Sequence, residues 1–265
     1  MQRPSPYVRD TGSGPGVVCL HCNASASGQW KALADLLSGS YRVLAPDLYG
    51  SGKSPPCPTD RLITLSDEVA LIEPVLRTPG APVFLVGHSH GGAVAMMAAL
   101  LHPELVRALI LYEPSVFALV DAHTPPPNGV DGIRNTVTAS LVALDAGDNE
   151  TAARIFIDFW NPGSWEATPV DRRPMLARSA TNLRHWDHSL FGETTPLAAF
   201  AKLRMPILCM MGGKSPESGH AVARLLLPEW PHAQVVEFPE LGHMGPVTHP
   251  QMVNAEIAKF LALHR

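Results

Sequence analysis

The chain has 265 residues and 46% of them are hydrophobic, so it can form one large α/β domain with a buried core. Its formal net charge is −4 and its basic residues are scattered, which argues against nucleic acid and against an anionic membrane surface as partners. Residues 1–10 lack the apolar run of a secretory signal, and the apolar stretch 93–101 is too short to span a bilayer. We therefore expect a cytoplasmic protein, by default a monomer, with a dimer left open.

Short β-branched runs alternate with helical patterns in the first 112 residues, which is typical of a mostly parallel sheet. Strands are expected at 17–20, 42–45, 83–86 and 108–112, and helices at 30–37, 65–76 and 93–101. A second series follows residue 204, with strands at 207–211 and 234–238, a helix at 221–227 and a C-terminal helix. We therefore expect residues 1–114 and 205–265 to form one α/β core.

Residues 115–204 differ in character from this core. They begin with a loop signal at 125–129, continue with helical patterns at 133–144 and 151–159, and contain no convincing strand. A helical insertion between two strands should cover the carboxyl ends of the sheet, where open α/β sheets bind ligands, so we expect a helical lid. We expect most of its aromatic residues to pack in the core of the lid and one or two to contact substrate, with Phe159, Trp160 and Trp186 as our choices among Phe156, Phe159, Trp160, Trp165, Trp186 and Phe191.

Cysteine and histidine spacing gives no sign of a metal site. The cysteines form no metal-ligand set, and we expect reduced thiols at all four positions: Cys19, Cys22, Cys57 and Cys209. The twelve histidines include no HExxH array. We expect no metal, no cofactor and a small-molecule substrate.

Ser89 is the candidate nucleophile. It lies in the run 87–92 (GHSHGG), directly after the apolar run 83–86 and directly before a helical pattern. A strand that passes into a helix with no intervening loop must make a sharp, strained turn, which pushes the serine hydroxyl out of the backbone. A glycine-rich turn without chemistry, or a phosphate cradle, is the alternative interpretation of this run.

A nucleophilic serine needs a base within hydrogen-bond reach, and His243 is the best candidate. It lies in the glycine-rich loop 241–246, between the last expected strand and the C-terminal helix. That loop should bring the imidazole to the same edge of the sheet as Ser89. His249 and His264, expected on the final helix, are weaker candidates.

Four motifs in order make the chain resemble the α/β-hydrolase family: residues 21–23 (HCN), 45–54 (APDLYGSGKS), 87–92 (GHSHGG) and 242–243 (GH). The resemblance implies an eight-stranded sheet, a helical lid after the sixth strand and a Ser-acid-His triad. It also implies an oxyanion hole with two backbone amides, one of His90 and one from the loop after the first of these strands. Asn23 is our choice for the second donor, with Cys22 as the alternative because a cysteine replaces the usual glycine.

The acid of the triad departs from the family pattern. Many such hydrolases carry an aspartate after the seventh strand, but the corresponding run here, 212–215, ends in serine. Holding the imidazole in one tautomer requires an anion, and Glu113, at the end of the strand 108–112, is our choice. Glu217 and Asp187 are held in reserve.

These residues favour a serine hydrolase that cleaves a small or medium ester through an acyl-enzyme, with Ser89, His243 and Glu113 as the triad. Serine argues against dehalogenase and epoxide hydrolase chemistry, since those relatives attack with aspartate. Lactonase, thioesterase, C–C hydrolase and perhydrolase reactions stay open, because the fold cannot choose among them. A ligand-binding pseudoenzyme is the alternative from another class.

Overall fold

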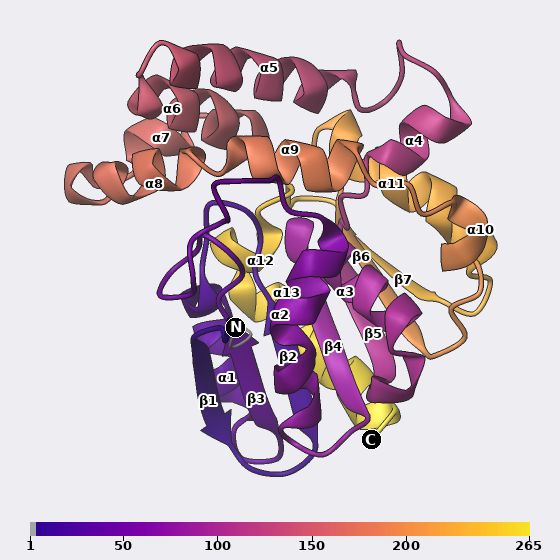
Figure 1. Cartoon of the computed structure of the whole chain (residues 1–265). Coiled ribbons are helices and arrows are strands. Elements are labelled where there is room, and N and C mark those ends of the chain that lie inside the picture. The colour runs from indigo at the N-terminus through magenta and orange to yellow at the C-terminus, as the bar shows by residue number, and fades with distance from the viewer. Residues whose placement is uncertain (1–3) are drawn as a thin grey trace.

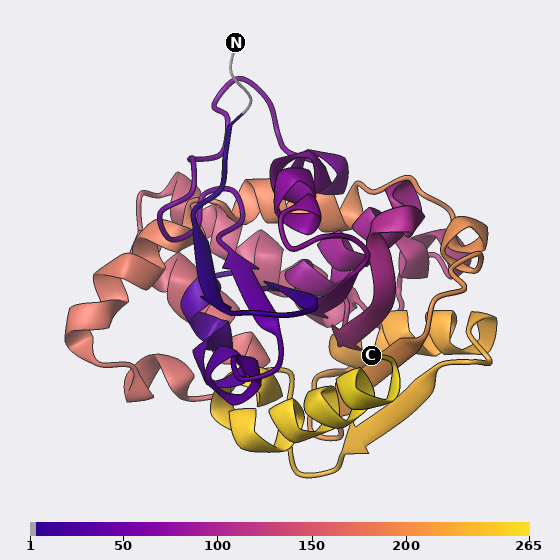
Figure 2. The same cartoon turned by 90° about the horizontal axis from the view of Figure 1, so that it is seen from below.

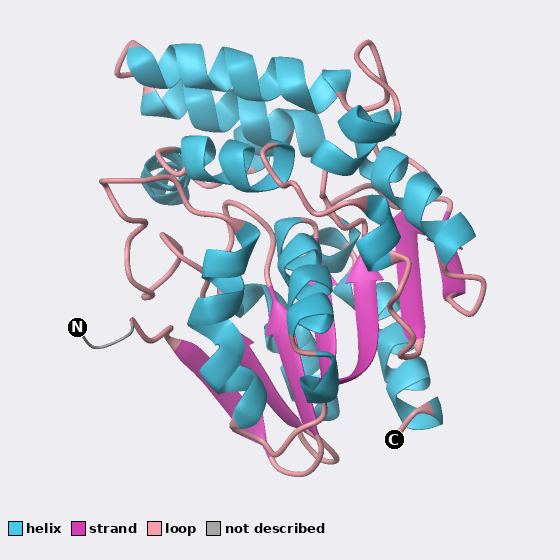
Figure 3. Cartoon of the chain, turned by 45° about the vertical axis from the view of Figure 1, so that its right-hand side comes forward, coloured by secondary structure: helices cyan, strands magenta, loops and turns pink. Residues whose placement is uncertain are grey.

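The computed structural model describes residues 4–265, whose strands form a seven-stranded sheet in the order β1-β3-β2-β4-β5-β6-β7 (Figures 1 and 3). β1 pairs antiparallel with β3, and the other neighbours pair in parallel. The strands are β1 (Val8–Gly12), β2 (Gly16–Leu20), β3 (Arg42–Pro46), β4 (Val83–His88), β5 (Val106–Tyr112), β6 (Ile207–Gly212) and β7 (Gln234–Phe238).

Helices cover both faces of the sheet, as Figure 2 shows from below. Alternate strand residues point to opposite faces, so Val18 and Leu85 join one apolar cluster while Val17 and Val86 join the other. The first cluster includes side chains of α2 (Leu65–Arg77), α3 (His90–Leu101) and α11 (Glu217–Leu226). The second includes those of α1 (Lys31–Leu37) and α13 (Pro250–Leu263). The central strands are therefore buried on both faces, as a parallel sheet requires.

The chain between β5 and β6 is helical and lies above the carboxyl ends of the strands in Figure 1. Its apolar side chains, among them Trp165 and Trp186, join the first cluster, so this segment packs onto the rest of the molecule. No helix within residues 4–265 has both the length and the apolar character needed to cross a bilayer. The helices of the segment are α4 (Ala118–His123), α5 (Asp131–Asp145), α6 (Asn149–Trp160), α7 (Ser164–Ala167), α8 (Arg173–Ala180), α9 (Leu183–Phe191) and α10 (Leu197–Phe200).

The α/β class and the mostly parallel sheet are confirmed, but two counts are corrected. The described residues hold seven strands instead of eight, and the helical segment follows the fifth strand of the chain instead of a sixth. The sequence patterns also missed β1. Four of its five residues are exposed, so it carries none of the apolar signal that marks a buried strand.

Glu68 is a fully buried carboxyl on α2. Its Oε2 accepts a hydrogen bond of 3.2 Å from the Tyr49 amide, whereas its Oε1 has no partner in the described structure. Burial raises the pKa of Glu68 to about 8. The folded protein therefore holds a proton here that the unfolded chain releases near pH 4.3, at about the reference pKa of glutamate.

This proton makes stability depend on pH. As the pH rises from about 5 to 8, the free energy of unfolding of the wild type should fall relative to that of Glu68→Gln, by at most about 1.4 kcal/mol per pH unit. Above the raised pKa the difference in free energy between the two proteins should become constant. Urea unfolding at several pH values measures this difference. The exposed Glu229 serves as a control, because Glu229→Gln should follow the wild type throughout. A pH-independent difference for Glu68→Gln would contradict the raised pKa.

Candidate active site

Ser89 occupies a strained turn between β4 and α3. It has φ 54° and ψ −117°, and its amide donates to the Tyr112 carbonyl at 3.0 Å. Glycine is required at position 91, because a Cβ there would lie 2.4 Å from the Leu20 carbonyl oxygen of the neighbouring strand. The local structure is thus the sharp strand-to-helix turn expected from the sequence, with the hydroxyl directed out of the backbone.

The structure brings Ser89, His243 and Glu113 together. The Ser89 hydroxyl lies 2.9 Å from His243 Nε2, and His243 Nδ1 lies 2.6 Å from Glu113 Oε2. The carboxylate accepts from Nδ1–H, which leaves Nε2 free to accept the serine proton. The imidazole and the carboxylate are 1% and 0% exposed, so water does not compete for this bond. The three groups form a continuous hydrogen-bonded chain.

Glu113 has further donors that suit an ionised acid. Burial raises the pKa of Glu113, but the hydrogen bond and charge of His243, together with bonds from Ser215 and Gly212, outweigh it and lower the pKa. Oε1 accepts from the Ser215 hydroxyl at 2.5 Å and from the Gly212 amide at 2.7 Å. Ser215, which stands where the family resemblance predicts an acid, therefore binds the carboxylate of Glu113, the residue directly after β5. Gly219 lets α11 pack closely against the Glu113 carboxylate, because a Cβ at this position would lie 2.5 Å from Glu113 Oε2.

The two reserve acids do not contact His243. Glu217 pairs with Arg224 on the exposed face of α11. Asp187 lies on α9 and has no hydrogen bond among residues 4–265. Of these three acids, Glu113 alone hydrogen-bonds the imidazole of His243.

Two backbone amides are available as donors: that of His90, directly after Ser89, and that of Asn23, which lines the same cavity as Ser89. His90 is the first residue of α3, so its amide has no partner within the helix. Neither this amide nor that of Asn23 donates to another group in the described chain. The Cys22 amide, by contrast, already donates to Gln29 Oε1 at 3.1 Å, which favours Asn23 over Cys22. Burial also raises the pKa of the Cys22 thiol to about 12, so at neutral pH it stays protonated and is a poor nucleophile.

A mostly apolar cavity lies against Ser89 and His243. The ring of Trp160 stacks on that of His243 with centroids 3.8 Å apart, and Trp186 also lines the cavity. Phe159, the third expected aromatic, does not line it and packs edge-on against Trp160 at 4.9 Å. The cavity is lined by Cys22, Asn23, Ser89, Ser115, Phe117, Ile133, Val137, Phe156, Trp160, Leu183, Trp186, Asp187, Leu190, Phe191, His243 and Met244.

Sequence reasoning missed a relay of three hydrogen bonds behind the site. Gln29 accepts from the Cys22 amide through Oε1 and donates from Nε2 to His88 Nδ1 at 3.0 Å. His88 Nε2 then donates to the His243 carbonyl at 2.8 Å. Burial, followed by the nearby charge of His243, holds the pKa of His88 well below its ordinary value, so the ring is neutral. The relay ties the loop of the candidate oxyanion donors to the loop of the base.

Breaking this relay should impair turnover without removing any reacting group. We expect His88→Phe to lower kcat for ester hydrolysis by about 100-fold, since a shift of about 1 Å in a reacting group can have that effect. His88→Gln should recover part of the loss, because an amide keeps one donor and one acceptor. Steady-state kinetics on a nitrophenyl ester, with thermal unfolding to verify folding, makes the comparison. Equal losses in both variants would rule out a role for these hydrogen bonds.

The sequence matches the alpha/beta hydrolase family over residues 17–256, and the chain belongs to that family. Among curated relatives, the pimeloyl-[acyl-carrier protein] methyl ester esterase of Yersinia enterocolitica is 29% identical over 253 residues, covering 92% of each chain. Human monoglyceride lipase is 27% identical over 216 residues, covering 78% of this chain and 67% of the lipase.

Solved structures show the same fold. A hydrolase from Pseudomonas aeruginosa superposes with a TM-score of 0.77 at 23% identity, covering 96% of this chain and 93% of that one. A thermophilic esterase from Thermogutta terrifontis superposes with a TM-score of 0.71 at 23% identity, covering 98% and 94%. These likenesses support the architecture of the sheet and its covering helices.

Proposed function

We propose that this protein is a serine hydrolase that cleaves small or medium carboxylic esters through an acyl-enzyme on Ser89. The observation that carries the proposal is the continuous chain from the Ser89 hydroxyl through His243 to Glu113, at 2.9 and 2.6 Å, beside a cavity. Relatives that match over most of their length carry the names of esterases, which supports ester bonds as the substrate class.

Each group has a defined part in the proposed reaction. His243 Nε2 takes the Ser89 proton as the oxygen attacks the ester carbonyl, and the amides of His90 and Asn23 stabilise the oxyanion. His243 then returns the proton to the departing alcohol. The same imidazole activates the water that hydrolyses the acyl-enzyme, while Glu113 stays ionised and stabilises the imidazolium.

The segment 115–204 is proposed to act as a lid over this chemistry, with 1–114 and 205–265 as the catalytic core. Trp160 and Trp186 are proposed to contact substrate, since both line the cavity and Trp160 also stacks on the base. Phe159 is not proposed to contact substrate, because it packs edge-on against Trp160 and does not line the cavity. The monomeric state and the cytoplasmic location stay predictions from the sequence.

A panel of nitrophenyl esters of graded acyl length tests the function. We expect turnover with a maximum of kcat/KM at short or medium acyl length, because the cavity is small and mostly apolar. Lactones, thioesters and C–C substrates assayed alongside would reveal whether one of the other serine-dependent reactions is faster. A folded protein that turns over none of them would favour ligand binding without catalysis.

A further inference from the structure

Asp187 is the only carboxylate among the residues that line the active-site cavity. It lies on α9, where Leu183 and Leu190, four and three positions away, line the same cavity and therefore share its helix face. Most of the other lining side chains are apolar. The proposed acyl-transfer reaction already has its acid in Glu113, so the chemistry gives Asp187 no part.

Asp187 has no partner in the part of the chain that the structure describes. Within residues 4–265 it has neither a hydrogen bond nor an ion pair. Burial raises the pKa of Asp187, and the charges of Arg134 and His188 oppose that rise only in part. Its carboxylate is thus half-buried against an apolar cavity without a donor of its own.

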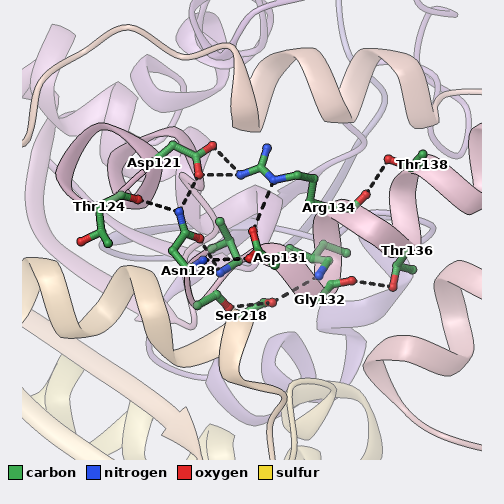
Figure 4. Close-up of polar contacts among 12 residues, drawn as sticks. Asp121, Thr124, Asn128, Asp131, Gly132, Arg134, Thr136, Thr138 and Ser218 are labelled. Atoms are coloured by element: carbon green, nitrogen blue, oxygen red, sulfur yellow. Dashed lines mark hydrogen bonds and ion pairs between the residues drawn. The ribbon is translucent and has the colours of Figure 1, made fainter. Parts of the chain in front are cut away.

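The nearest structural explanation, a salt bridge to Arg134, is not available. Figure 4 shows the Arg134 guanidinium held by Asp121 and Asp131 near the start of α5. Its Nη2 donates to both Asp121 oxygens, at 2.5 and 2.6 Å, and the guanidinium also lies 4.5 Å above the Phe191 ring. Arg134 is therefore held by Asp121 and Asp131, and although its Nε has no hydrogen-bond partner in the described structure, it forms no ion pair with Asp187, which lines the cavity.

In the free enzyme water can hydrate this half-buried carboxylate, but a substrate arm that fills the cavity displaces that water, which is unfavourable unless the arm itself donates a hydrogen bond. We propose, on the basis of the ester hydrolase function above, that Asp187 is a specificity-determining residue. It selects esters that carry a hydrogen-bond donor, such as an ammonium, hydroxyl or amide group, on the arm that occupies the cavity. For the same reason it disfavours esters with a free carboxylate there, since two like charges in an apolar cavity repel.

Matched substrates test this selection. The first series is ethyl heptanoate and its analogues in which the terminal methyl is replaced by hydroxyl, ammonium or carboxylate. The second series places the same four end groups on the alcohol arm of acetate esters. The enzymes are the wild type, Asp187→Asn, Asp187→Leu and, as a matched control, Asp171→Asn, which removes an exposed carboxylate of the same segment.

In at least one series the wild type should favour the ammonium or hydroxyl ester over the methyl ester by about tenfold or more in kcat/KM, with the carboxylate ester the poorest. Asp187→Asn should remove the preference for ammonium, Asp187→Leu should favour the methyl ester, and Asp171→Asn should keep the wild-type ranking. A wild type that hydrolyses the esters without this preference, or an unchanged ranking in Asp187→Asn, would overturn the inference about Asp187 and leave the proposed ester hydrolase function standing. Hydrolysis of none of the esters would instead remove the proposed function. Should the Asp187 variants fail to fold, the wild-type ranking decides.

Discussion

Ser89→Ala is expected to lower kcat for ester hydrolysis by about 10⁵- to 10⁶-fold, as loss of the nucleophile does in other serine hydrolases. Without the hydroxyl no acyl-enzyme can form, and only the oxyanion donors and the cavity still act on the ester. Initial rates on a nitrophenyl ester measure the loss, and thermal unfolding shows whether the variant is folded. The fold should survive, because the turn at this position is set by its backbone and by the glycines around it.

Ser140→Ala is the matched control for this substitution. Ser140 is fully buried on α5 and its hydroxyl has no partner in the described structure, so removing it changes no proposed reacting group. It should retain kcat within about a factor of three, since its effect is confined to local packing. Residual activity of the Ser89 variant above about a hundredth of wild type would show that another group carries the reaction.

Glu113→Gln is expected to lower kcat by about 10⁴-fold, the loss seen when the acid of a serine triad becomes an amide. An amide has no charge to stabilise the imidazolium, and its NH₂ can turn the ring toward the wrong tautomer. The hydrogen bonds from Gly212 and Ser215 are also arranged for an ionised acceptor. Single-turnover and steady-state rates should fall together, because the step that suffers is the proton transfer itself.

Glu217→Gln is the comparison for this variant, because Glu217 is the carboxylate closest in the sequence to position 215, where the family resemblance predicts the acid. It is exposed and paired with Arg224, so its loss should leave kcat nearly unchanged. The reverse ranking of the two variants would remove Glu113 from the proposed triad.

The placement of the three proposed catalytic residues could be predicted from backbone logic. Carboxyl ends of parallel strands meet at one edge, so a residue after β4, one after β5 and one in the loop after β7 must come near each other. Glu113 could be predicted as the acid because position 215, where the family resemblance predicts an acid, carries a serine. Ser215 itself could not be assigned its place, because its bond to Glu113 depends on how the loop after β6 folds back.

Side-chain direction was the main limit of the sequence patterns. Phe159 and Trp160 are neighbours on α6, and one residue turns a helix by about 100°, so only one of them can face His243. Periodicity marks the apolar face of a helix but not its rotation against a partner. The relay through His88 and Gln29 could not be predicted either, because its hydrogen bonds join side chains and loops that are far apart in the sequence.

The central claim is that His243 activates the Ser89 hydroxyl, and labelling with a fluorophosphonate probe tests it most directly. Intact-mass measurement should show one stable adduct on the wild type, located on Ser89 by peptide mapping. Ser89→Ala and His243→Ala should both stay unlabelled while folded. Labelling of the His243 variant at the wild-type rate, or an adduct on any other residue, would contradict the account.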